Sequence, residues 1–190
     1  MREVELAKRE TRKKTAKPLP YAYKTLLYIA VGVLLLFTII TKNDFVLLLF
    51  FMALSTAINY ETNMTSIRFN PQPEVFASLV LAKMVGFHYS FIMLILPTVL
   101  VDIYTARLDP DTFISLALTA IISFLMATVH ILDFLPLALI LVTMKFIIGS
   151  AINLALDLSM EELLFEHVLG FVVNAVLLLA FGSFLFAYFA

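Results

Sequence analysis

Long, nearly uninterrupted apolar runs, separated by short polar segments, constrain the fold of this chain most strongly. Residues 26–40, for example, are apolar apart from a glycine and a threonine. Such runs lack the one-sided stripe of amphipathic helices and the alternation of β-barrel strands, so they predict helices that cross a bilayer. Only 14% of the residues are charged, against about 25% in an ordinary soluble domain. We therefore predict an all-α, polytopic transmembrane bundle of six or seven helices.

The N-terminal residues differ sharply in charge from the rest of the chain. Residues 1–24 contain eight basic and three acidic side chains, whereas the remaining residues contain five basic and eleven acidic ones. A basic block directly before a spanning helix resists translocation and keeps the N-terminus in the cytoplasm. We predict a basic cytoplasmic extension over residues 1–20, a transmembrane domain over residues 21–190, and a multi-pass location in the cell (inner or plasma) membrane.

The polar breaks divide the apolar sequence into seven predicted helices. They cover residues 21–40, 45–58, 75–85, 87–104, 112–132, 133–156 and 163–189. Residues 75–104 are long for one span and short for two, so a hinge at Gly86 and a single tilted helix are both considered, and the hinge is preferred. The tight turn at residues 41–44 predicts an antiparallel hairpin, and residues 59–74 are predicted to be the longest polar connection. Seven spans would place the C-terminus outside, and six would place it inside.

Two polar stripes lie within the predicted spans. At helical spacing they are Lys145, Gly149 and Asn153 in one span, and His167, Gly170 and Asn174 in the last span. A charge near the centre of a transmembrane helix costs about 2.5 to 3.5 kcal/mol and therefore faces the bundle interior or water. We predict that the two stripes line one cavity, with Asp102 or Glu166 as the counter-charge of Lys145. The alternative is a structural salt bridge with amide bonds between helices.

The remaining ionisable residues and the motifs give no sign of catalysis. His88, His130 and Asp133 lie near span ends and are expected at the membrane interface. The chain has no cysteine, no HExxH or GxSxG motif, no glycine-rich phosphate loop, and three scattered histidines without ligand spacing. We predict no enzymatic activity, no catalytic residues, no metal and no cofactor. The basic extension lacks interleaved aromatic residues, so it predicts contact with the membrane surface rather than with nucleic acid.

From Pro73 onward, the order of segments resembles a known superfamily. A proline-led short helix (Pro73-Glu74-Val75-Phe76), a glycine turn (Gly86-Phe87) and a helix ending in an acidic residue (Val101-Asp102) follow one another. This order is similar to that of the S components of energy-coupling-factor vitamin transporters and of the related rod-shape-determining membrane subunits. The resemblance implies a substrate-binding subunit that works with a coupling partner. S components carry an alanine-xxx-alanine patch on the first helix, whereas Ala22 and Ala30 here are eight residues apart.

Together these observations predict a membrane subunit that binds a small polar or anionic solute for transport and is energised by a partner, because the chain has no nucleotide-binding motif. The predicted substrate-binding residues are Lys145, Asn153, His167, Asn174 and Asp102. The alternative function is a non-catalytic scaffold or accessory subunit of a larger membrane complex. Under both hypotheses the partners are the lipid bilayer and other protein subunits.

Overall fold

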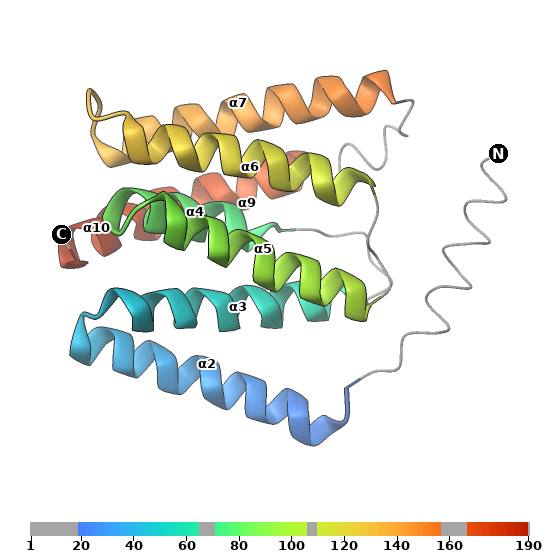
Figure 1. Cartoon of the computed structure of the whole chain (residues 1–190), viewed down its shortest axis with the longest axis vertical. Coiled ribbons are helices and arrows are strands. Elements are labelled where there is room, and N and C mark those ends of the chain that lie inside the picture. The colour runs from blue at the N-terminus through green and yellow to red at the C-terminus, as the bar shows by residue number, and fades with distance from the viewer. Residues whose placement is uncertain (1–18, 65–70, 106–109, 157–166, 190) are drawn as a thin grey trace, which may run out of the picture.

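The computed structural model describes residues 19–64, 71–105, 110–156 and 167–189, and these residues form a bundle of helices (Figure 1). Its elements are α2 (Tyr21–Thr41), α3 (Asp44–Met64), α4 (Pro73–Met84), α5 (Phe87–Tyr104), α6 (Pro110–Thr128), α7 (Phe134–Ala155), α9 (Leu169–Leu177), the π-helical segment η2 (Leu178–Gly182) and α10 (Ser183–Phe189). The all-α prediction is therefore confirmed.

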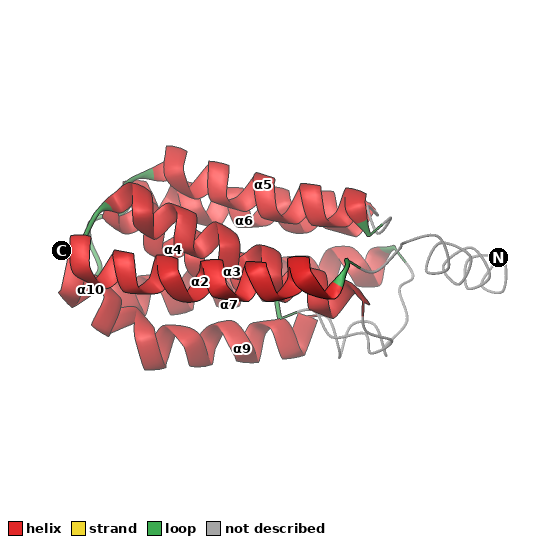
Figure 2. Ribbon diagram, turned by 90° about the horizontal axis from the view of Figure 1, so that it is seen from below, coloured by secondary structure: helices red, strands yellow, loops and turns green. Residues whose placement is uncertain are grey.

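Five helical segments are long and apolar enough to cross a bilayer. They are α2, α3, α5, α7 and the continuous segment Leu169–Tyr188. Apolar residues Thr112–Thr128 of α6 form a shorter helix, and α4 has only 12 residues. These seven segments run alternately in opposite directions along the bundle, so the start of α2 and the end of α10 lie at opposite ends (Figures 1 and 2).

The first two helices form the predicted antiparallel hairpin. Lys42 ends α2 in a left-handed conformation (φ 49°), and its N–H donates to the Thr38 carbonyl. The Asn43 side-chain oxygen then accepts from the N–H groups of Phe45 at 2.9 Å and Val46 at 3.3 Å, which satisfies two donors at the start of α3. A two-residue turn thus joins two helices of 21 residues each.

A glycine separates α4 from α5, as the hinge prediction requires. Gly86 has φ 124° and ψ 166°, a conformation that is essentially restricted to glycine. Helix α4 ends at Met84, and α5 starts at Phe87. The single tilted helix considered as an alternative is therefore wrong.

The predicted polar connection over residues 59–74 is wrong at both ends. Helix α3 continues to Met64, and α4 already begins at Pro73. The polar side chains at the end of α3 have partners within the bundle: Glu61 pairs with Lys24 at 3.0 Å, and Asn63 donates to Asp102 at 2.9 Å. These contacts explain how polar residues remain helical where composition alone predicted a loop.

Helix α4 occupies the centre of the bundle. It contacts α3, α5, α6, α7, α9 and α10, and it lies among the other helices in both views (Figures 1 and 2). Every residue from Pro73 to Ala82 is buried. A short helix thus lies at the centre of the core, and the other helices pack around it.

Candidate functional site

The start of α4 lies inside the bundle. Twelve helical residues span about 18 Å, less than the roughly 30 Å of a bilayer's hydrocarbon core. Since α4 ends at the same end of the bundle as α5 begins, its first turn lies far from both ends (Figure 1). A helix that starts within a membrane leaves backbone N–H groups that need partners there.

Asn174 of α9 supplies much of that pairing. Its side-chain oxygen accepts from the Phe76 N–H at 3.0 Å, while its NH₂ group donates to the carbonyls of Pro71 at 3.0 Å and Gly170 at 2.8 Å. Pro73, the first residue of α4, has no N–H to satisfy. One buried amide from the last span therefore caps α4 and holds the chain that enters it.

Lys145 of α7 reaches the same place. Its ammonium donates to the side-chain oxygen of Gln72, the residue that precedes α4 and adopts a left-handed conformation at φ 46°. Both side chains are buried, and Lys145 is only 9% exposed. The predicted site residue on α7 therefore points at the start of α4.

A buried carboxylate lies beside this lysine. Glu74, in the first turn of α4, is 6% exposed and accepts from the Asn59 NH₂ group at 3.4 Å. Glu74 follows Gln72, the hydrogen-bond partner of Lys145, by two residues, so both charged groups lie at the start of α4. An acidic residue in the first turn is also favoured by the helix dipole. Asn59, Gln72 and Glu74 were predicted to lie in a connection and were not among the predicted site residues, although Pro73 followed by an acidic residue is a usual helix-start signal.

The two predicted polar stripes do face each other. The Asn153 side chain contacts Nε2 of His167, and a methyl group added at Gly149 would lie 3.6 Å from the His167 ring. The side-chain oxygen of Asn153 is buried and has no hydrogen-bond partner in the part of the chain that the structure describes. Lys145 and Asn174 therefore lie at the start of α4, whereas Asn153 and His167 form a second contact between α7 and the start of the last span.

Asp102 belongs to a different set of contacts. Its carboxylate accepts from Asn63 at 2.9 Å and from Thr112 at 3.0 Å, which joins the ends of α3, α5 and α6. Glu74, rather than Asp102, lies two residues from Gln72, the hydrogen-bond partner of Lys145. The expected counter-charge role of Asp102 is therefore corrected, and Glu166 lies outside the described residues.

The other ionisable residues lie away from this site. His88, His130 and Asp133 are exposed, as their positions near span ends predict. Among the described residues, no group of three or more histidine, cysteine, aspartate or glutamate side chains could hold a metal ion.

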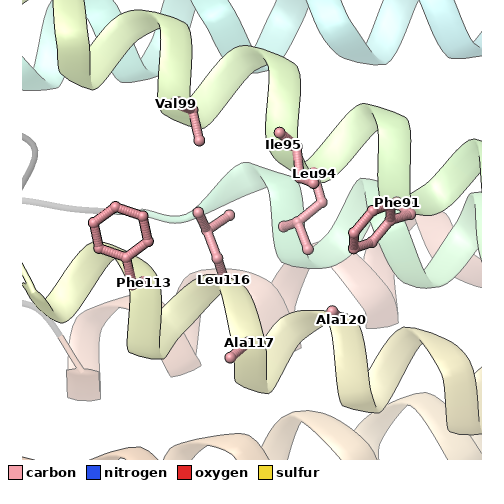
Figure 3. Close-up of a pocket in the computed structure, with 8 residues that line it drawn as sticks. All are labelled: Phe91, Leu94, Ile95, Val99, Phe113, Leu116, Ala117 and Ala120. Atoms are coloured by element: carbon pink, nitrogen blue, oxygen red, sulfur yellow. The ribbon is translucent and has the colours of Figure 1, made fainter.

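A separate cavity of about 320 Å³ lies between α5 and α6 (Figure 3). Its lining is entirely apolar and comes from Phe91, Leu94, Ile95 and Val99 of α5 and from Phe113, Leu116, Ala117 and Ala120 of α6. The polar residues at the start of α4 do not line it. This cavity could hold apolar groups only, so it is distinct from the polar candidate site.

In comparisons with known proteins, no family model, no curated protein and no solved structure matches this chain.

Proposed function

We propose that this protein is an integral membrane subunit that binds a small polar or anionic solute for transport, with energy supplied by a partner subunit. The observation that carries the proposal is the start of α4 inside the bundle, next to the buried ammonium of Lys145. Transporters commonly bind solutes near the bilayer midplane, where discontinuous helices present their ends to the substrate.

The side chains around α4 suit recognition rather than reaction. Lys145 supplies positive charge, and amides from three other segments supply both donors and acceptors: Asn59, Gln72 and Asn174. The solute would be held by these groups, and no bond would be made or broken on this chain.

The proposal also includes an orientation in the membrane and a partner that supplies energy. The basic residues before α2 hold the N-terminus in the cytoplasm, and seven segments that alternate in direction then put the end of α10 on the outer side. The resemblance to S components supports a partner that supplies energy. The resemblance depends on the order of three residues. Pro73 is the first residue of α4, Gly86 lies in the turn that follows, and Asp102 lies near the end of α5.

Native mass spectrometry of the protein purified in mild detergent from its own organism tests this function. We expect the wild type and Lys42→Met to retain a polar small molecule and Lys145→Met to lose it, because Lys42 lies in the exposed turn after α2. An energy-supplying ATPase that co-purifies would support the partner hypothesis. Equal retention by both variants, or no small molecule in any of them, would contradict solute binding at Lys145.

A scaffold or accessory subunit is the second candidate, and the surface of α2 favours it. This helix packs mainly on α3, and Thr38 is its one buried residue. Its broad apolar surface is available to lipid or to another subunit. Deletion of residues 2–17 discriminates the two candidates, because a transport subunit should tolerate that deletion better than loss of Lys145, whereas a scaffold should show the reverse.

A further inference from the structure

The candidate site contains one buried positive and one buried negative group. Lys145 and Glu74 are 9% and 6% exposed, and they come from α7 and from the first turn of α4. The pair is electrically neutral as a whole. The solute class expected from Lys145 alone, an anion, therefore needs to be reconsidered with Glu74 included.

Both charged groups have hydrogen-bonding capacity that their described partners do not use. An ammonium has three donors, and among the described residues the Lys145 ammonium has Gln72 as its hydrogen-bond partner. A carboxylate has about four acceptor positions, whereas Glu74 accepts from Asn59 at the long distance of 3.4 Å and from its own backbone N–H. The buried oxygen of Asn153, about two turns further along α7, has no partner among the described residues.

Charge balance decides which ligand can use that capacity. A charge inside a bundle is costly unless it is paired, because the surroundings have a low dielectric constant. A monovalent anion bound at Lys145 would leave the Glu74 carboxylate uncompensated unless Glu74 took up a proton, and a monovalent cation bound at Glu74 would leave the Lys145 ammonium uncompensated unless Lys145 lost one. A ligand that carries both charges keeps the site neutral.

We infer that the solute is a small zwitterion whose anionic group binds Lys145 and whose cationic group binds Glu74. This inference rests on the proposed function and names its solute class. On binding, the anionic group takes the place of the Gln72 oxygen at Lys145, and the cationic group replaces the Asn59 amide at Glu74. The third nearby charge, Asp102, is already bound by Asn63 and Thr112, so it stays with its own partners.

A matched panel of small molecules tests this inference on the purified full-length protein. The zwitterions are glycine, β-alanine and 4-aminobutanoate, the matched anions are acetate, propionate and butyrate, and the matched cations are methylamine, ethylamine and propylamine. The measurement is the shift of the melting temperature in detergent with ligand concentration. We expect at least one zwitterion to raise the melting temperature of the wild type, with its matched anion and cation at least about tenfold weaker.

Two charge-removing variants sharpen the test because they should change preference in opposite directions. Glu74→Gln leaves Lys145 as an unbalanced cation, so this variant should come to prefer the matched monocarboxylate. Lys145→Met leaves the carboxylate unbalanced, so it should come to prefer the matched amine. Glu61→Gln is the control, because Glu61 bonds to Lys24 and Tyr28 at the periphery, and its ligand preference should remain that of the wild type.

The outcomes separate this inference from the proposed function. In one outcome, a monocarboxylate stabilises the wild type as strongly as its matched zwitterion does, and this stabilisation is lost in Lys145→Met but kept in Glu74→Gln. That outcome would overturn the zwitterion inference and leave the solute-binding proposal intact. A response to none of the three classes, in a protein that also retains no small molecule, would overturn both. If the single variants do not fold, the wild-type panel decides the ligand class without them.

Discussion

Helices α2 and α4 are both apolar, yet they have opposite surroundings. Helix α2 has 21 residues, of which Thr38 alone is buried, whereas all residues of α4 from Pro73 to Ala82 are buried. The more apolar of the two helices is the one at the edge of the bundle. Hydrophobicity therefore does not distinguish the interior from the surface here, because lipid is as apolar as a protein core.

The two helices differ in how the backbone groups at their starts are hydrogen-bonded. The start of α2 lies at one end of the bundle (Figure 1), whereas the start of α4 lies within it, is capped by Asn174 and is reached by the buried side chain of Lys145. A helix that ends at the membrane surface can be capped by water, but a helix that begins within the bundle needs protein groups for the same purpose. Because α4 begins within the bundle, it is short and its first turn is surrounded by polar side chains.

The largest effect is expected from removing the cap of α4. Asn174→Leu leaves the Phe76 N–H and the Pro71 carbonyl unpaired and should lower the free energy of unfolding by about 3 kcal/mol. Thr25→Val is the control on α2, since among the described residues its hydroxyl bonds to the Tyr21 carbonyl of its own helix, and it should change little. Reversible unfolding in bicelles measures both, and equal effects would show that the buried start of α4 does not need this cap.

A matched pair of leucines gives the next effect. Leu79 of α4 is fully buried, whereas Leu36 of α2 is 61% exposed. Because unfolded helices remain in lipid, Leu79→Ala loses little transfer free energy, but the cavity that it leaves should cost about 2 kcal/mol. Leu36→Ala should stay within about 0.5 kcal/mol of the wild type. A large loss for Leu36→Ala in the same unfolding measurement would mean that a partner, and not lipid, covers α2.

Two glycines extend the comparison to the backbone, and only the substitution at Gly86 should destabilise the protein. Gly86→Ala forces a side chain into a backbone conformation that glycine alone adopts readily, which should cost about 1 to 3 kcal/mol. A methyl group at Gly32 of α2 would meet nothing within 4 Å, so Gly32→Ala should be neutral or stabilising by up to about 1 kcal/mol. Melting temperatures in detergent are sufficient here, and destabilisation by Gly32→Ala would indicate a close helix contact at that position.

The bilayer-spanning helices were largely predictable from composition and local signals. Gly86 marked the turn between α4 and α5, and the segment around Asn43 marked the hairpin. The face of α7 that carries Lys145, Gly149 and Asn153 also followed from helical spacing, and all three residues belong to the buried face. Within one helix, periodicity determines which residues share a face, so these features needed no knowledge of neighbours.

The composition of the polar site was less accessible. Asn59 and Glu74 are 15 residues apart, and Lys145 and Gln72 are 73 apart. The polarity of residues 59–74 predicted a loop, and only packing between helices could reveal that Asn59, Gln72 and Glu74 have buried partners. The same reason explains why Asp102 was assigned to Lys145: its actual partners, Asn63 and Thr112, come from the two neighbouring helices.

The linear order of apolar and polar residues was enough to establish a helical membrane protein, its helix breaks and the face of α7 that turns inward. Those properties depend on the transfer of side chains into lipid and on hydrogen bonds within each helix, both of which are local. The tertiary structure alone decided that the shortest helix is central, that α2 lies at the edge, and that Glu74 is the charge beside Lys145. In lipid, all apolar faces are nearly equivalent, so the fit between helices and the pairing of their few polar groups selects the arrangement.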